Sequence, residues 1–116
     1  MMALQEPDVP APIERLGGGW VAKEAVSIGL YSVLSIRSFR DAVLRAVNHS
    51  GDSDSTGAIA GNIAGLIYGV DAIPVSWLEG LELRNEITAV ADDLLAVREE
   101  TLELENESTW RRYPGW

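Results

Sequence analysis

Glycine recurs at every fourth position through one apolar stretch of the chain, at Gly57, Gly61, Gly65 and Gly69. Residues four apart lie on the same face of an α-helix, so the spacing predicts a helix that begins at Ser55 or Thr56 and ends at Tyr68. Each interior glycine costs a helix about 1 kcal/mol relative to alanine, and only the close approach of another backbone or a ligand would offset that cost. We therefore expect a tightly packed central helix. The other core positions on this helix are Ile59, Ile63, Leu66 and Ile67.

Apolar spacing predicts further helices on both sides of this segment. Their expected ranges are residues 21–35, 39–48, 74–81 and 84–103. Ser38 is a good N-cap for the second of these helices, and Asp41 can pair with Arg45 one turn later. No segment predicts a strand, so the expected fold is all-α.

Proline and glycine mark a boundary near the N-terminus. Prolines are dense in the first 12 residues, so residues 1–16 are predicted to form an extended arm, followed by a single helical domain over residues 17–116. The triplet over residues 17–19 could cradle a phosphate, but no strand precedes it and no Gly-Lys-Ser/Thr follows. We therefore interpret it as a flexible turn into the first long helix. Three aromatic residues of the C-terminal tail are expected to dock on a surface: Trp110, Tyr113 and Trp116.

Charge and composition exclude several classes of function. The net charge is −9 and Lys23 is the single lysine, whereas a nucleic-acid surface needs clustered cations, so no nucleic-acid partner is expected. Cysteine is absent, which excludes a disulfide framework and a thiolate metal site. The longest apolar run, residues 58–70, is about half a membrane span, and the first 12 residues lack the pattern of a signal peptide. We expect no membrane partner and a cytoplasmic protein.

The segment just before the glycine-rich helix concentrates the candidate chemistry. Asp52 and Asp54 alternate in an expected loop over residues 50–54, with the Ser55 hydroxyl beside them. Two close carboxylates repel unless a proton or a cation lies between them, and hard divalent ions prefer oxygen ligands. The loop can therefore offer three ligands to Mg²⁺ or a similar ion. Three ligands do not close a six-coordinate site, so waters, a substrate or another segment must complete it.

Two other interpretations of this segment stay open on the residues alone. An EF-hand would place Asp52 and Asp54 at loop positions 1 and 3, but position 12 needs a bidentate glutamate and holds Ile63. Alternatively, Asp54 or Ser55 is simply the N-cap of the helix, and Asp52 is a loop aspartate. His49, the single histidine, could contact a substrate or carry a proton, or it could cap the end of the preceding helix.

The segment over residues 48–62, Asn-His-Ser-Gly-Asp-Ser-Asp-Ser-Thr-Gly-Ala-Ile-Ala-Gly-Asn, resembles the C-terminal metal motif of the ADP-ribosylglycohydrolase family. Residues 18–25 resemble the segment that precedes this motif in bacterial members. Residues 77–78, 81–84 and 111–116 also fit the family. The resemblance covers nearly all of the chain after residue 15. It implies an all-helical fold, an orthogonal helical bundle, of which this chain holds the C-terminal part.

The resemblance also implies an activity, the hydrolysis of the glycosidic bond that joins ADP-ribose to a protein side chain or a small molecule. The expected cofactor is Mg²⁺, or Mn²⁺ in its place, and the metal ligands of the family map onto Asp52, Asp54 and Ser55. Water activated at the metals would attack the anomeric carbon. Expected contacts with the substrate, ADP-ribose or an ADP-ribosylated protein, come from Asn48, His49, Gly51 and Ser53.

Family members are more than twice this length, and their N-terminal half supplies a second carboxylate cluster that completes a two-metal site. Nothing in residues 1–16 can replace that cluster, so we expect a truncated relative with half of the cofactor site, inactive by itself. The loss of family packing partners predicts self-association as a homodimer. The alternative is a non-catalytic helical module that oligomerises or binds partners and holds divalent ions weakly at most.

Overall fold

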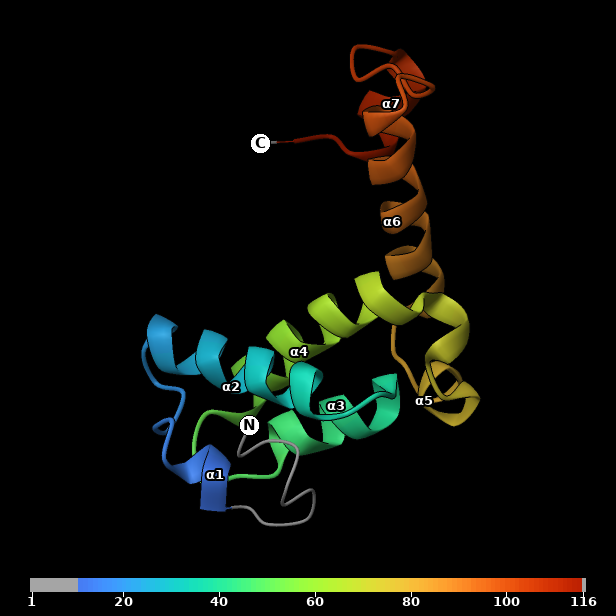
Figure 1. Cartoon of the computed structure of the whole chain (residues 1–116). Helices are drawn as coiled ribbons and strands as arrows, with labels where there is room; N and C mark the ends of the chain where they lie inside the picture. The colour runs from blue at the N-terminus through green and yellow to red at the C-terminus, as the bar shows by residue number, and fades with distance from the viewer. Residues whose placement is uncertain (1–10, 116) are drawn as a thin grey trace. The chain divides into compact units, whose positions relative to one another are not determined.

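The computed structural model describes residues 11–115, and every regular element in that range is helical. The helices are labelled in Figure 1. They are α1 (Ala11–Glu14), α2 (Ala22–Ser35), α3 (Phe39–Val47), α4 (Ser53–Tyr68), the 3₁₀ turn η2 (Val70–Ala72), α5 (Val75–Glu79), α6 (Arg84–Arg98) and α7 (Glu107–Arg112). The all-α prediction is confirmed. None of the described helices combines the length and the apolar character needed to cross a membrane.

The contacts of the chain group it into two compact units, residues 1–77 and 78–116. The sequence predicts one domain over residues 17–116 after an extended arm. Within the described part of that arm, Ala11–Glu14 forms one helical turn instead of extended chain. Pro12 is compatible with this turn because the first residues of a helix need no backbone N–H donor.

Capping sets the start of α3 as the sequence predicts. Ser38 Oγ accepts a hydrogen bond from the backbone N–H of Asp41 at 3.1 Å. The expected pair between Asp41 and Arg45 is wrong. Asp41 pairs with its neighbour Arg40 at 2.8 Å, and Arg45 donates to Ser35 Oγ at 3.0 Å, so this arginine joins α3 to the end of α2.

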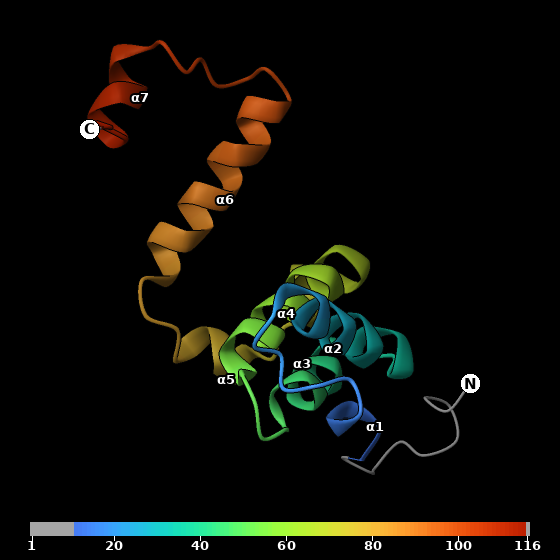
Figure 2. The same ribbon diagram turned by 90° about the vertical axis from the view of Figure 1, so that its left-hand side faces the viewer.

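In the first unit, α4 packs against both α2 and α3 (Figures 1 and 2). Its buried residues, Thr56, Ala60 and Ala64, recur once per turn. Small side chains let the helices approach closely. At Gly29 of α2, for example, there is no room for a side chain, since an added Cβ atom would lie 2.6 Å from Ile59 Cγ2. The rest of the buried core cluster consists of Val33, Phe39, Ala42 and Ala46. This position of α4 between two helices agrees with the predicted central helix.

The glycine-bearing face of α4 differs from the prediction. Gly57 lies against α3, where an added Cβ atom would meet a valine methyl carbon at 2.6 Å. At Gly61 and Gly65, no atom of the described residues lies within 4 Å of such a position. Leu66 and Ile67, expected in the core, are 89% and 57% exposed. The expected tight packing is therefore wrong for the second half of α4, because α2 and α3 cover only the alanine face of the helix.

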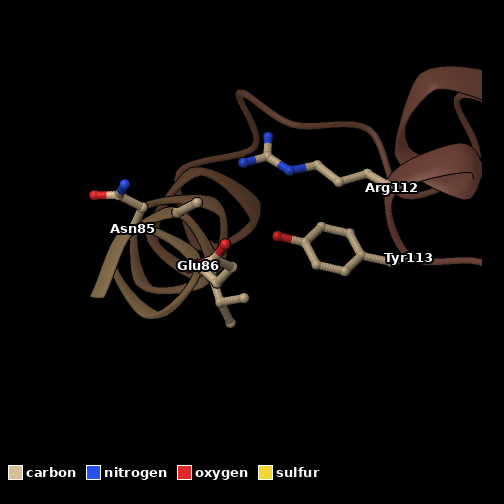
Figure 3. A pocket seen from close by; sticks show the side chains of 6 residues that line it. Asn85, Glu86, Arg112 and Tyr113 are labelled. Carbon is tan, nitrogen blue, oxygen red and sulfur yellow. The ribbon is translucent and has the colours of Figure 1, made fainter. Parts of the chain in front are cut away.

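The second unit consists of α6, α7 and the segment that joins them. The helix α6 ends before the predicted residue 103, because Glu100 adopts left-handed backbone with φ +58°. Asp93 of α6 accepts a hydrogen bond from the Tyr113 hydroxyl at 2.7 Å and pairs with Arg112 at 3.0 Å. Figure 3 shows Arg112 and Tyr113 extending toward α6 beside a pocket. The expected docking of the aromatic tail is thus observed for Tyr113. Trp110 is 56% exposed, and Trp116 lies outside the described residues.

Candidate metal half-site

The N-terminus of α4 brings the three predicted metal ligands together. Asp52 is the N-cap residue, and its Oδ1 accepts a hydrogen bond from the backbone N–H of Ser55 at 3.4 Å. Asp54 and Ser55 follow in the first helical turn. A hydrogen bond with the Asp54 carboxyl group, and then one with the Ser55 hydroxyl, lower the pKa of the Asp52 carboxyl below its ordinary value.

The start of α4 decides between the interpretations that the sequence leaves open. An EF-hand loop would keep the chain irregular well beyond Asp52, whereas α4 is helical from Ser53 onward, so an EF-hand is excluded. The segment does cap the helix, but the capping residue is Asp52 rather than Asp54 or Ser55. Capping and metal binding are compatible, because a carboxylate offers about four lone-pair sites and the cap uses one of them.

The glycine triplet before α2 packs directly against this loop. The backbone N–H of Asp52 donates to the carbonyl oxygen of Gly18 at 2.7 Å. A Cβ atom on Gly51 would lie 1.8 Å from that same oxygen, so a side chain at this position has no room. Gly19 adopts φ +76°, and an added Cβ atom there would lie 2.9 Å from Thr56 Cγ2. The triplet leads into α2 and is also in close backbone contact with the candidate site, a contact that the sequence does not indicate.

The short helix α1 also contacts the loop. Glu14 accepts hydrogen bonds from the backbone N–H of Ser50 at 3.4 Å and from the Ser50 hydroxyl at 3.1 Å. Ile13 beside it is buried. Figure 1 shows α1 close to the segment that joins α3 to α4. Residues that the sequence assigns to an arm thus help to hold the candidate site, and no local pattern in the sequence indicates this.

His49 and Thr56 join the end of α3 to the start of α4. Thr56 is fully buried, and its hydroxyl donates to the Ala46 carbonyl oxygen at 2.7 Å. His49 Nε2 lies 2.9 Å from Thr56 Oγ1, and the backbone N–H of Gly51 donates to His49 Nδ1 at 3.1 Å. Both ring nitrogens are therefore engaged within the loop. Capping of α3 by His49 is not observed, because Asn48 is the C-cap residue.

The predicted substrate contacts surround the same loop. Asn48 is exposed at the end of α3, and His49 is half-buried. Ser53 Oγ lies 3.4 Å from the carbonyl oxygens of both His49 and Gly51, so it is also engaged within the loop. Gly51 contributes backbone alone. The role of these four residues toward a substrate stays a prediction.

The donor set fits part of a site for a hard cation. Two carboxylates and a hydroxyl are the oxygen ligands that Mg²⁺ and Mn²⁺ prefer. Two ionised carboxylates in close proximity repel, and a cation between them relieves the repulsion. Over residues 11–115, no group of three or more His, Cys, Asp or Glu side chains is arranged to hold a metal ion. Asp52, Asp54 and Ser55 are therefore three candidate oxygen donors, too few by themselves to close a six-coordinate site.

The described residues thus form an all-α fold in which two aspartates and a serine lie at the N-terminus of a glycine-rich helix. A family model described as ADP-ribosylglycohydrolase matches residues 1–103 of this chain. The chain belongs to the ADP-ribosylglycohydrolase family, as its central motif predicts.

Three curated relatives illustrate how much of the family the chain covers. It is 45% identical over 62 residues to the ADP-ribosyl-[dinitrogen reductase] glycohydrolase of Rhodospirillum rubrum, and this aligned stretch covers 52% of this chain and 21% of the relative. It is 35% identical over 71 residues to the ADP-ribosylarginine hydrolase Tri1 of Pseudomonas putida, 61% of this chain and 19% of the relative. Human ADP-ribosylhydrolase ARH3 is 29% identical over 93 residues, 71% of this chain and 26% of the relative. No solved structure matches the chain. The chain thus spans about a fifth to a quarter of the length of these relatives.

Proposed function

We propose that this chain carries part of the metal site of an ADP-ribosylglycohydrolase, and that the ion is Mg²⁺, or Mn²⁺ in its place. The observation that carries the proposal is the gathering of Asp52, Asp54 and Ser55 at the start of α4, within the segment that matches the family. The names of the relatives describe hydrolases that act on ADP-ribosylated dinitrogen reductase or ADP-ribosylarginine. ADP-ribose joined to a protein side chain is therefore the proposed class of substrate.

The roles of the residues follow from their chemistry. A bound divalent ion supplies Lewis-acid assistance for the hydrolysis of a glycosidic bond. Asp52 and Asp54 would hold the ion by their charge, and the Ser55 hydroxyl would add a neutral oxygen donor. These three donors leave the site incomplete, so the rest of it must come from a segment beyond these 116 residues, on the same polypeptide or on another. We expect the 116-residue chain by itself to release no ADP-ribose.

Metal binding is the direct test of this proposal. Isothermal titration of Mn²⁺ into the purified chain is expected to show saturable binding, and Asp54→Ala is expected to weaken it about tenfold or more. Loss of an outer hydrogen-bond partner of a metal ligand already costs about 10- to 100-fold in affinity, and an anionic ligand contributes at least as much. Asp41→Ala is the matched control, because Asp41 also lies exposed in the first turn of a helix. Unchanged binding in Asp54→Ala, or no binding by the wild-type chain, would contradict the proposal.

A helical oligomerising module is the second candidate function, and the exposed surface of α4 favours it. Residues 55–70 contain no charged side chain, so almost the whole of α4 is uncharged around its circumference. A helix of this kind is normally buried on all sides. Exposed apolar residues also form a stripe at every fourth position of the neighbouring α2: Val26, Leu30 and Leu34. We propose a homodimer that covers these faces. A cytoplasmic location stays a prediction.

Sedimentation equilibrium tests the homodimer. We expect the wild-type chain to self-associate, and Leu66→Glu to weaken the dimer about tenfold or more, because burial of one leucine contributes roughly 1.5–3 kcal/mol and 1.4 kcal/mol is a factor of ten. Leu66 is 89% exposed, so the substitution should leave the fold of the protomer intact. Val75→Glu, at an exposed position outside the α2 and α4 faces, is the control. A wild-type chain that is monomeric at all concentrations would rule out the module in this form.

A further inference from the structure

We propose that His49 and Thr56 are positioning residues for the metal half-site, because their hydrogen bonds set the direction in which the Asp52 carboxylate faces. This role rests on the proposed function, since it concerns the ion that the carboxylates would hold. Neither His49 nor Thr56 would touch that ion. The sequence suggests that His49 contacts a substrate or carries a proton, and the geometry points to a different task.

Thr56 provides the fixed point of the arrangement. It is fully buried one turn into α4, and its hydroxyl has a single proton to donate. The shortest contact of Thr56 Oγ1 is 2.7 Å, to the Ala46 carbonyl oxygen of α3, and this acceptor receives the proton. Longer contacts reach the carbonyl oxygens of Asp52 at 3.1 Å and Ser53 at 3.2 Å. The lone pairs of Oγ1 then face His49 Nε2 at 2.9 Å and accept its N–H.

The direction of these bonds determines the tautomer of His49. The backbone N–H of Gly51 donates to Nδ1 at 3.1 Å, so Nδ1 carries no proton and the neutral ring holds its proton on Nε2. Nε2–H then donates to Thr56 Oγ1, and every donor in the series meets an acceptor. A ring with both nitrogens engaged offers no lone pair to a metal ion and no proton to a substrate unless the loop opens.

Two consecutive peptide groups of the loop are fixed by this arrangement. His49 holds the N–H of Gly51, and the Gly18 carbonyl oxygen holds the next N–H, that of Asp52, at 2.7 Å. The backbone N–H of Thr56 donates to the Asp52 carbonyl oxygen at 3.2 Å from the other side. The backbone of Asp52 is thereby held at φ −74° and ψ 76°, which fixes the point from which its side chain extends. Outer hydrogen bonds that orient ligands in this way contribute about 10- to 100-fold to metal affinity.

A pair of substitutions at Thr56 separates positioning from packing. Thr56→Val keeps the shape of the side chain and removes the hydroxyl, whereas Thr56→Ser keeps the hydroxyl and removes a methyl group. Mn²⁺ alone is titrated into the 116-residue chain, and the free ion is measured by electron paramagnetic resonance. We expect Thr56→Val to weaken Mn²⁺ binding about 10- to 100-fold and Thr56→Ser to stay within about threefold of wild type. A packing role would give the reverse order, because the methyl group of Thr56 is the part that faces Gly19, where an added Cβ atom would lie 2.9 Å from it.

The tautomer of His49 gives a second readout that needs no ion. The chain has one histidine, so its long-range ¹H–¹⁵N spectrum contains the signals of His49 alone. We expect the Nε2–H pattern in the wild type and a mixture of tautomers in Thr56→Val. If Thr56→Val does not fold, His49→Gln takes its place. Glutamine keeps an N–H donor for Thr56 but lacks the Nδ1 acceptor for Gly51, so the same loss of Mn²⁺ affinity is expected.

The outcomes separate this role from the metal proposal. A folded Thr56→Val chain with wild-type Mn²⁺ affinity would overturn the positioning role and leave the metal proposal intact, and so would a mixture of tautomers in the wild type. A wild-type chain that binds no Mn²⁺ would overturn the metal proposal, and with it any role of His49 and Thr56 toward an ion.

Discussion

Gly51→Ala is expected to destabilise the first unit by about 3 kcal/mol and to abolish Mn²⁺ binding. Overpacking of a tight contact costs roughly 1–3 kcal/mol, and we expect the upper end of this range because the added methyl group would collide with a backbone atom. The added methyl group would lie 1.8 Å from the Gly18 carbonyl oxygen. That oxygen also accepts the N–H of Asp52, so it cannot move away without loss of a second hydrogen bond. Urea unfolding followed by circular dichroism measures the loss of stability, and Mn²⁺ titration measures the site.

Gly61→Ala is the matched control for this substitution. It also replaces a glycine of the same segment by alanine, but no described atom lies within 4 Å of the new methyl group. The interior of a helix favours alanine over glycine, so we expect Gly61→Ala to stabilise the first unit by about 0.5–1 kcal/mol. Mn²⁺ affinity should not change. If Gly51→Ala were as stable as the wild type, the close contact between the triplet and the loop would not exist in solution.

The helices of the first unit could be predicted because their signals are local, and the same kind of signal singles out the candidate metal ligands, whose role stays a prediction. The apolar spacing predicts a stripe of five core residues on α3, namely Phe39, Ala42, Val43, Ala46 and Val47. Phe39, Ala42 and Ala46 are buried and Val43 is half-buried, whereas Val47 is 37% exposed. Ser38 is recognisable as an N-cap from its type and position alone. Asp52 and Asp54 stand out as a pair of oxygen ligands by the same kind of reasoning, since residue type and spacing are both visible in the sequence.

The contacts that hold the site could not be predicted, because they join segments that are distant in sequence. Glu14 and Ser50 lie 36 residues apart. The chain also uses glycine for different reasons that no local pattern separates: Gly51 makes a close backbone contact, whereas Gly61 faces open space in the described structure. Apolar spacing likewise indicates that Leu66 should be buried, but not whether its partner lies within these residues. An apolar pattern therefore predicts that a surface is buried, but it does not identify the residues that bury it.

Transfer of the first unit into a longer relative is expected to give an active hydrolase. In this chimera, the part of the Rhodospirillum rubrum glycohydrolase that aligns with the chain is replaced by residues 11–77, so that the triplet, the loop and α4 move together. The aligned stretch is 45% identical and makes up 21% of that protein, so most of the relative stays native. The assay is release of ADP-ribose from ADP-ribosylated dinitrogen reductase, with the unmodified relative and the 116-residue chain measured beside the chimera.

We expect the chimera to release ADP-ribose. The substitution Asp54→Asn in the chimera is expected to lower the rate of release about 100-fold or more. Loss of an outer hydrogen-bond partner already lowers metal affinity or activity about 10- to 100-fold, and loss of an anionic ligand should lower it at least as much. Asp41→Asn in the same chimera should keep full activity, since Asp41 lies exposed on α3 and forms its ion pair with Arg40. A folded chimera without activity would mean that Asp52, Asp54 and Ser55 do not hold the family's metal in this chain. Equal activity in both variants would mean that the relative's remaining residues suffice for catalysis and that the loop only caps α4.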